Sequence, residues 1–279
     1  MEILERHSIA IDCWSVLFPS STTFLLSHLH TDHADIPKSF QYPVYASEVT
    51  GILCGSSNSN DKSNTSNAIR AILKPGCWYR THQYHIPFKV YDTMHTVESI
   101  GFYFPSLSVL YMGDSVESII PVVHRPLSVI YDGLYEGMHQ NIPTPAQACT
   151  CIRQTLEVHC PVLQLVHHGI LSFISSSCHT LFRLHSSAPL LVRKTALFLG
   201  IVDDTSPYMI VGRDYTDGPR IVPSSYWFMR DPSIDPFVTH VDGDKFRVFC
   251  SLHAHSQDIA HWKRTSPYAH FEALATTPV

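Results

Sequence analysis

Four side chains that can bind a metal ion lie close together near the N-terminus. His28, His30, Asp32 and His33 directly follow residues 23–26, an apolar run that predicts a buried strand. His28 and His30 alternate with an apolar residue along an extended chain, so both can point to the same side. Imidazole and carboxylate ligands in this combination suit Zn²⁺. Two of them could serve one ion and two a neighbouring ion.

A chance cluster is the plain alternative, because the chain contains 19 histidines. A strand followed by His-x-His alone would be weak evidence for a metal site. The full pattern H-x-H-x-D-H at the exit of an apolar strand is far more specific. We therefore interpret His28, His30, Asp32 and His33 as metal ligands.

A hydrolase with two metal ions needs further ligands and a carboxylate that bridges the ions. His95, Asp114 and His253 are the candidates, because each lies at the end of an apolar run or just past one. Each also has a structural alternative: His95 as a loop histidine, Asp114 as a turn former, and His255 as a competitor of His253. The three together, in this order, predict a second part of the metal site.

The strands that would carry these groups can be read from the hydrophobic pattern. Residues 107–111 and 127–131 are apolar runs that lead to Asp114 and Asp132, respectively. Two strands thus each deliver a carboxylate at the C-terminal end, where open α/β sheets place their chemistry.

Later segments predict more elements of the same kind. Residues 144–159 have a helical pattern, with Thr144 as a cap and Pro145 in the first turn. Residues 162–166 predict a strand, and residues 246–250 predict another that leads to His253. Proline and aspartate crowd residues 203–236, which predicts loops or an inserted region.

Composition sets further limits on the class of protein. The 279 residues can bury a sizeable core, and the formal net charge of −5 does not show the basic footprint of many nucleic-acid-binding proteins. Bound divalent cations would add local positive charge that a side-chain count omits. We expect no membrane span and no secretory signal, and we interpret the eight cysteines, which form no C-x-x-C pair, as thiols in a reducing compartment.

The motifs, taken in order, resemble those of the metallo-β-lactamase superfamily, and the later ones resemble the β-CASP nucleases of the Artemis and Apollo DNA cross-link repair family. The segments that carry the resemblance are Ile9–Ser15, Phe24–His33, Asp92–His95, Leu110–Asp114, Ile130–Asp132, Pro143 with Gln147, and Ser251–His253. The first metal motif identifies only the superfamily. Asp132 and the terminal S-x-H point to the β-CASP group.

The resemblance implies a role for each matching residue. One zinc ion would be held by His28, His30 and His95, and a second by Asp32, His33 and His253. Asp114 would bridge the two ions, and Asp132 would be an additional acidic group that handles protons or orients a ligand. The implied catalytic groups are therefore Asp32, Asp114 and Asp132, with two divalent ions, expected to be Zn²⁺, as cofactors.

The chain departs from the family at the segment that would hold phosphate. The family's G-x-Y-S-x-G-K-E motif corresponds to residues 165–171, where only Gly169 matches and Ile170 replaces the lysine. His167 and His168 either bind phosphate as hydrogen-bond donors or are polar core residues. Residues 96–98 differ from the family's H-C-P-G, and Ala254 and His255 replace its paired serines. The expected substrate-binding residues are His167, His168, Gly169 and His255.

The expected fold is α/β, a four-layer αββα metallo-β-lactamase sandwich with an inserted β-CASP domain. We place the first part of the sandwich at residues 1–145, the insert at 146–238 and the second part at 239–279. We expect a monomer in the nucleus that acts on DNA, single-stranded or with free 5′ ends, and associates with no membrane.

The expected activity is a zinc-dependent 5′-to-3′ DNA exonuclease of cross-link or double-strand break repair. An RNA-processing β-CASP nuclease is an alternative, since RNA-type members end in a further histidine and His270 lies near the C-terminus; the final Val279 resembles the DNA type. A small-molecule hydrolase would not need the long segment between Asp132 and His253. A catalytically silent scaffold is the remaining alternative.

Overall fold

The computed structural model describes residues 2–15, 17–37, 39–55, 69–116, 128–137, 142–166, 168–178, 180–224 and 237–274, with Ser233 and Asp235. The chain divides into two compact units. The first unit consists of Met1–Met138 and His253–Val279, and the second of His139–Leu252. The second unit is therefore an insertion in the first.

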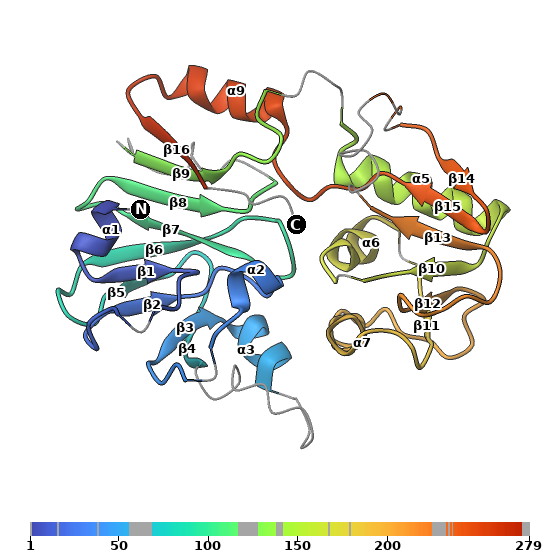
Figure 1. The fold of residues 1–279 in the computed structure, drawn as a ribbon, viewed down its shortest axis with the longest axis horizontal. Coiled ribbons are helices and arrows are strands. Elements are labelled where there is room, and N and C mark those ends of the chain that lie inside the picture. The colour runs from blue at the N-terminus through green and yellow to red at the C-terminus, as the bar shows by residue number, and fades with distance from the viewer. Residues whose placement is uncertain are drawn as a thin grey trace. The chain divides into compact units, whose positions relative to one another are not determined.

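Two sheets form the centre of the first unit (Figure 1). One sheet has four parallel strands in the order β1-β2-β3-β4, namely β1 Ile9–Ile11, β2 Thr23–Leu25, β3 Val44–Ser47 and β4 Ile69–Leu73. The other has six strands in the order β16-β9-β8-β7-β6-β5, namely β5 Trp78–Arg80, β6 Pro87–Asp92, β7 Ile100–Phe104, β8 Val109–Gly113, β9 Ser128–Asp132 and β16 His270–Leu274. Its β5–β8 strands are antiparallel neighbours, whereas β8, β9 and β16 run parallel.

The main core of this unit lies between the two sheets. Buried side chains of the first sheet, such as Ile9 and Leu25, meet Phe88 and Phe102 of the second in one cluster. Burying a side chain of this size contributes roughly 1.5–3 kcal/mol. The alternation of residues along β6 and β7 supplies these inward-facing positions.

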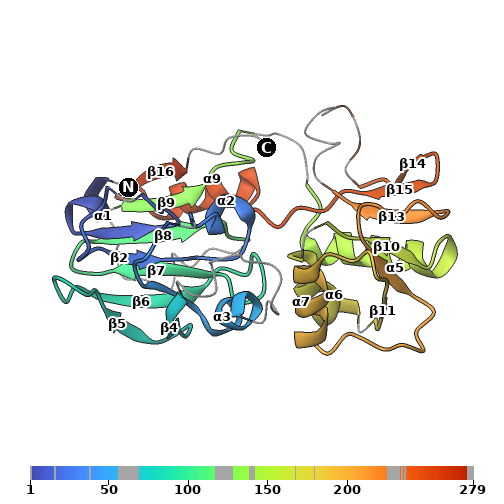
Figure 2. The same cartoon turned by 60° about the horizontal axis from the view of Figure 1, so that its bottom comes forward.

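Each sheet is also covered on its outer face. Helix α9 (Ser256–Thr265) packs Ile259 and Trp262 against Leu110 and Val129 of the six-stranded sheet, and Figures 1 and 2 show it beside β9 and β16. On the four-stranded sheet, Phe40 and other residues pack against Phe24, and α3 (Glu48–Gly55) follows β3. The order helix, sheet, sheet, outer layer confirms the predicted α/β sandwich.

The second unit contains a six-stranded sheet in the order β11-β12-β10-β13-β15-β14. Its strands are β10 Val162–Gln164, β11 Arg183–Leu184, β12 Met209–Val211, β13 Arg220–Pro223, β14 His240–Asp242 and β15 Lys245–Val248. Only β14 is antiparallel to its neighbour. Three helices share a buried apolar cluster with this sheet, namely α5 (Pro145–Val158), α6 (Ile170–Cys178) and α7 (Leu190–Phe198).

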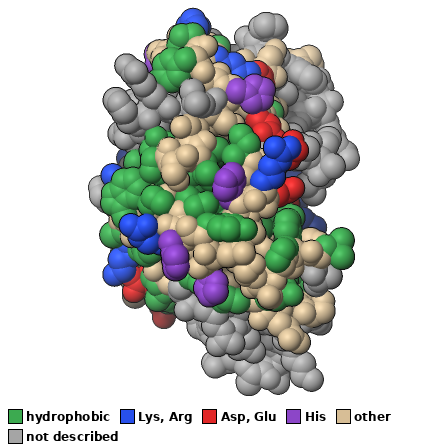
Figure 3. All heavy atoms as spheres, turned by 90° about the vertical axis from the view of Figure 1, so that its left-hand side faces the viewer, with side chains coloured by type: hydrophobic (Ala, Val, Ile, Leu, Met, Phe, Trp, Pro, Cys, Tyr) green, Lys and Arg blue, Asp and Glu red, His purple; other side chains and the backbone are tan. Residues whose placement is uncertain are grey.

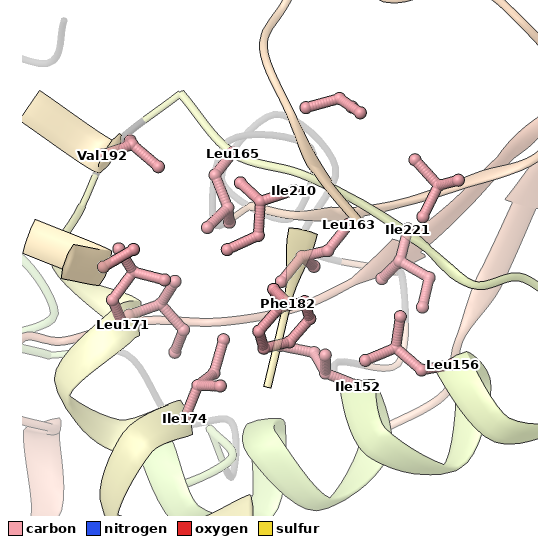
Figure 4. Close-up of a cluster of buried hydrophobic side chains, with 14 of the residues drawn as sticks. Ile152, Leu156, Leu163, Leu165, Leu171, Ile174, Phe182, Val192, Ile210 and Ile221 are labelled. Atoms are coloured by element: carbon pink, nitrogen blue, oxygen red, sulfur yellow. The ribbon is translucent and has the colours of Figure 1, made fainter. Parts of the chain in front are cut away.

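One apolar cluster holds the second unit together. Figure 4 shows Leu163 and Ile210 of the sheet close to Phe182, with Ile152 of α5 and Ile174 of α6 beneath them. The cap predicted for α5 is present, since the Thr144 hydroxyl accepts a hydrogen bond from Gln147 N and Thr144 N donates to the Gln147 side chain.

The boundaries of the second unit differ from the predicted 146–238. Contacts place residues 139–145 and 239–252 in the second unit, because β14 and β15 extend the sheet that begins with β10. Residues 203–236 were expected to be loops or an insertion, but β12 and β13 lie within them. Strands of three or four residues carry too little hydrophobic pattern to stand out. The identity of this unit as a β-CASP domain stays a prediction.

Two further observations concern the surface. Within the residues described, no helix combines the length and apolar character that crossing a bilayer requires. Figure 3 shows one face of the first unit, where hydrophobic side chains lie among histidines and among both basic and acidic side chains. Among the described residues, this face shows no continuous basic patch of the kind found on many DNA-binding proteins.

Candidate metal centre

The predicted ligands of the first unit come together although they are far apart in sequence. His28 and His30 lie between β2 and the short helix α2 (Thr31–Ala34), and His95 lies in the turn after β6. Asp114 follows β8, Asp132 ends β9 and His253 precedes α9. Two compact groups of potential ligand atoms result, namely His28, His30, His95 and Asp114, and Asp114, Asp132 and His253, each with all its atoms within 4.8 Å of one another.

Three imidazole rings form the first group. The ring centroids of His28, His30 and His95 are each 4.7 Å from the other two. His95 Nε2 and His30 Nδ1 face each other at 3.0 Å. Three histidines that converge in this way are a ligand set used for Zn²⁺.

Asp114 is the carboxylate that both groups share. Its Oδ2 lies near a nitrogen of each of four imidazoles: 3.5 Å from His95 Nε2, 3.5 Å from His33 Nε2, 3.7 Å from His28 Nε2 and 3.9 Å from His253 Nδ1. The side chain is only 8% exposed. A bridging carboxylate of a two-metal site requires this position between two groups of ligands.

Local backbone geometry sets the direction of Asp114. Gly113 has φ +56°, and a Cβ atom there would lie 2.9 Å from the Tyr111 ring. The pairing of β8 with β9 shifts between Tyr111 and Gly113. A glycine at this irregularity lets the chain turn so that the next residue leaves the sheet edge.

Burial and neighbouring charges together set the protonation states at the centre. Burial favours the neutral form of Asp114, but the His33 hydrogen bond and the charges of His95, His28 and His253 outweigh it and hold the pKa of Asp114 well below its usual value. Burial, together with the neighbouring histidines, holds the pKa of His28 well below its usual value. The carboxylate is thus ionised and His28 neutral, which are the forms that bind metals.

A buried carboxylate that sequence reasoning did not assign to the site, Asp12, orients the ligands. Asp12 Oδ2 accepts hydrogen bonds from His33 Nδ1 at 2.9 Å, Ser27 Oγ at 2.6 Å and Tyr111 OH at 2.9 Å, while Oδ1 accepts from Ser27 N at 2.8 Å. A signal for it existed, since Asp12 directly follows an apolar strand. Without knowledge of the fold, nothing connected it with His33.

Hydrogen bonds around Asp12 also fix the tautomer of His28. The Ser27 hydroxyl has one proton, which it donates to the Asp12 carboxylate, so it accepts a hydrogen bond from His28 Nδ1 at 2.9 Å. His28 Nε2 is then the unprotonated nitrogen. It is buried and has no hydrogen-bond partner in the described part of the chain, which is consistent with a nitrogen that binds a metal ion.

A second carboxylate acts on His253. Asp132 Oδ2 accepts a hydrogen bond from His253 Nδ1 at 2.5 Å, and the Asp132 side chain is 1% exposed. Burial favours the neutral form of His253, but Asp132 and Asp114 outweigh it and raise the pKa of His253. Carboxylates that hold one ring nitrogen commonly direct the other towards a metal.

The turn that carries His95 is built around the Ser99 hydroxyl. Ser99 Oγ accepts hydrogen bonds from His95 N at 3.0 Å, Thr96 N at 3.0 Å and Thr93 Oγ1 at 2.9 Å. Met94 adopts φ +57°, in the region where non-glycine residues are uncommon. The Ser99 hydroxyl thus ties together the backbone of the turn that presents His95.

Asp32 and His33 lie beside the centre but outside the two compact groups. Asp32 has a 60% exposed side chain whose Oδ2 is 3.7 Å from His33 Nε2. The resemblance paired both residues with His253 on one ion, whereas the compact group around His253 contains Asp114 and Asp132. The assignment of individual ligands to each ion stays a prediction.

The donor set fits divalent metals. Histidine nitrogens and carboxylate oxygens are the ligands of zinc sites, and the buried, unprotonated His28 Nε2 is available to an ion. One ion could be held by His28, His30 and His95 and a neighbour by His253 with nearby carboxylates. Asp114 is placed to serve both.

The predicted substrate-binding residues have different locations. His167 lies outside the described residues, and His168 and Gly169 belong to the second unit, directly before α6. His168 is buried, and its carbonyl accepts a hydrogen bond from Leu171 N at 3.0 Å. His255 precedes α9, and its backbone N donates to Asp258 Oδ2 at 3.3 Å. Their binding roles stay predictions.

Comparisons with known proteins show similarity to solved structures only. No family model matches the chain, and no curated protein matches it. Among solved structures, it is similar to a metallo-beta-lactamase from Pontibacter korlensis, with 19% identity over 35% of this chain and 44% of that chain and a TM-score of 0.27. The metallo-beta-lactamase IND-7 is 22% identical over 43% and 48% of the two chains, with a TM-score of 0.28.

A metallo-beta-lactamase from Staphylococcus aureus subsp. aureus COL is 11% identical over 91% of this chain and 85% of that chain, with a TM-score of 0.29. The match spans less than half of the first two structures. At these identities and TM-scores, the likenesses carry no argument about activity. The metal centre is inferred from the positions of its own side chains.

Proposed function

We propose that this protein is a zinc-dependent nuclease of the β-CASP type, within the metallo-β-lactamase superfamily, that hydrolyses DNA from the 5′ end. The observation that carries the proposal is the position of Asp114, which belongs to both groups of ligands. Two ions that share a carboxylate suit the in-line displacement at a phosphodiester, where both the attacking and the leaving oxygen need stabilisation.

The residues of the chain would prepare this chemistry before substrate arrives. When bound, the metal ions would supply positive charge to phosphoryl oxygens and make water more acidic. Asp12 and Ser27 hold His33 and His28 in single orientations, and Asp132 does the same for His253. Ligands that are fixed in advance need no reorganisation during the reaction.

The insertion supports a substrate larger than a metabolite. The segment between Asp132 and His253 folds into a separate unit with its own sheet and core. A small-molecule hydrolase would not need a unit of this size. We propose that Gly169 and the N-terminus of α6, which directly follow the buried His168, contact a phosphate of the nucleic acid, since helix N-termini present backbone N–H groups to anions.

The position of His270 does not support the RNA-type alternative. The resemblance to RNA-type nucleases would need a histidine near the metal ligands at the end of the chain. In β16, however, Leu274 pairs with Asp132 and His270 with Ser128, at the opposite end of β9. Four residues of strand separate these ends by about 13 Å, so His270 is not the counterpart of that histidine.

The retained ligands favour an enzyme over a silent scaffold, because a site without a function would be free to lose them. The proposed setting is the nucleus and the repair of cross-links or double-strand breaks, with DNA as partner. Ile170 stands where the family motif has a lysine that helps to hold the terminal phosphate. Substrates with a 5′-phosphate and with a 5′-hydroxyl are therefore compared directly.

The test is an incubation of purified protein with single strands of DNA and of RNA, each with a 5′-phosphate or a 5′-hydroxyl, with zinc or with chelator. We expect 5′-end laddering of DNA that chelator abolishes. D114N, purified in the same way, should be inactive and controls for contaminating nucleases. Cleavage that persists in chelator, or no cleavage of any strand, would contradict the proposal.

A further inference from the structure

The outer face of the six-stranded sheet changes character from one side to the other. Over β8, β9 and β16 it is apolar, and Ile259 and Trp262 of α9 cover it. Towards the edge strand β5, the same face presents Trp78, which is 57% exposed. A large aromatic side chain this open on a sheet face calls for an explanation.

Strand register places three side chains of this face in one row. Trp78 of β5 pairs with Lys89 of β6, and Lys89 pairs with Tyr103 of β7. Phe88 and Val90 belong to the core between the sheets, so Lys89 points to the outer face because side chains alternate. Tyr103 packs in the cluster under α9 and marks the limit of the covered area.

Two more residues enlarge the row. Tyr91 lies two positions after Lys89 on the same face, and the Lys89 ammonium is 5.1 Å from the centroid of its ring. Arg80 lies two positions after Trp78, and is exposed. We call Trp78, Arg80, Lys89 and Tyr91 the β5–β6 surface.

The positive charge of this surface is not neutralised. Lys89 contacts the Tyr91 ring, and Arg80 Nη1 donates to the His85 carbonyl at 3.0 Å. Neither cation forms an ion pair with a carboxylate among the described residues. In a chain of net charge −5, two uncompensated cations beside an open tryptophan are complementary to an anionic, aromatic ligand.

We propose that the β5–β6 surface binds single-stranded nucleic acid, with a base stacked on Trp78 and phosphates near Arg80 and Lys89. Aromatic side chains accept any base, and cations beside them hold the backbone, which is how sequence-independent single-strand sites work. A duplex hides the faces of its bases, so the surface selects unpaired strands. The inference deepens the proposed nuclease function by naming the strand state of its substrate.

Strand β6 links this surface to one of the proposed metal ligands. Strand β6 carries Lys89 and Tyr91, ends at Asp92 and leads into the turn that holds His95. At about 3.3 Å per residue, Lys89 lies about 10 Å from the end of the strand. A strand bound here would lie on the unit that contains all the proposed metal ligands.

The test measures binding without cleavage. Wild-type protein in chelator is titrated into fluorescently labelled oligothymidylate, and anisotropy gives Kd at several salt concentrations. Trp78→Ala should weaken binding about tenfold, the loss of one stacked base, and Trp78→Phe should restore most of it. Arg80→Gln should lower the slope of log K against log salt by about 0.7, the loss of one phosphate contact.

The controls separate this surface from general effects. Tyr268→Ala removes an aromatic residue that is 51% exposed elsewhere on the first unit, and Arg153→Ala removes an exposed cation of α5; both should bind as wild type. Equal affinity of Trp78→Ala and wild type would overturn the proposal, as would binding of duplex in preference to single strands. Capture of a protein partner by this face with no oligonucleotide binding would also overturn it.

Failure of this inference can be told apart from failure of the proposed function. If Trp78→Ala still cleaves and still binds as wild type, only the surface is wrong. If oligonucleotide binding depends on Trp78 but no strand is cleaved with zinc, the surface stands and the nuclease activity does not.

Discussion

Asp12 Oδ2 accepts a hydrogen bond from His33 Nδ1 at 2.9 Å, across 21 positions of sequence. The bond leaves His33 Nε2 directed at Asp114, 3.5 Å away. One imidazole thus connects a buried orienting carboxylate with the carboxylate at the middle of the site.

Asp12→Asn should weaken metal binding without removing a ligand. Asparagine has no negative charge and only one acceptor oxygen, so an NH₂ group that cannot accept replaces either Oδ1 or Oδ2. The hydrogen bond that orients the His33 ring is therefore weakened or lost. Loss of such an orienting group typically costs about 10- to 100-fold in metal affinity. Isothermal titration with Zn²⁺ measures it, with the exposed Asp35→Asn as the control. Wild-type affinity in Asp12→Asn would remove Asp12 from the site.

Zinc binding should release a proton from His33. Burial lowers the pKa of this imidazole, but hydrogen bonds to Asp114 and Asp12 outweigh burial and raise its pKa to about 11. The metal-free form therefore carries a proton at neutral pH, and the metal-binding form does not. Zinc affinity should rise between about pH 6 and pH 8.

Titration in buffers of different ionisation enthalpy counts the released protons. His33→Ala should release about one proton fewer than wild type, whereas His28→Ala should change the count little, because the pKa of His28 is already low. Affinity that is flat with pH would contradict the assigned charge of His33.

Asp114→Asn should destabilise the metal-free protein. Nitrogens of four imidazoles lie within 3.9 Å of its Oδ2, and asparagine would remove the negative charge that faces the protonated His33 ring. Breaking a buried charge pair costs about 3–5 kcal/mol. Because the folded-state pKa of Asp114 is lowered, its stabilisation is present above the unfolded pKa of about 3.9 and is lost as pH falls through the folded value.

Urea unfolding in chelator at neutral pH tests this effect. The midpoint of Asp114→Asn should fall well below that of wild type, and the difference should shrink in acid. The exposed Asp217→Asn is the matched control and should unfold as wild type does. An unchanged midpoint would mean that Asp114 is not the counter-ion of the histidines.

Ser99→Ala should loosen the turn that carries His95. Its hydroxyl accepts from two backbone N–H groups, and both would be left buried without that acceptor. Each unsatisfied buried group costs about 1–3 kcal/mol. We expect lower stability and weaker zinc binding, measured by unfolding and titration. Ser106→Ala, in an exposed turn, should change neither.

Much of the site was predictable from the sequence because metal ligands are polar residues at the ends of apolar strands. His28, His95 and Asp114 show this pattern, and the structure brings them together. The prediction of Asp132 as an acidic group near the centre agrees with its hydrogen bond to His253. Periodicity and turn chemistry also predicted the cap of α5 correctly.

The remaining features depend on contacts between distant segments. The role of Asp12 depends on the pairing of β1 with β2, which brings Asp12 next to Ser27. The sequence alone does not show this contact. The role of Ser99 as a hydrogen-bond acceptor could not be predicted, because a serine in a turn has no distinctive sequence pattern. Short strands such as β12 and β13 form through their neighbours in the sheet, and so local sequence did not reveal them.

The most direct test of the account is the metal content of the protein, measured by mass spectrometry after equilibrium dialysis against Zn²⁺. We expect two zinc ions for each chain of wild type and about one for His253→Ala. His28→Ala should also lose an ion, whereas the exposed His261→Ala should not. Equal zinc content in wild type, His28→Ala and His253→Ala would contradict the account.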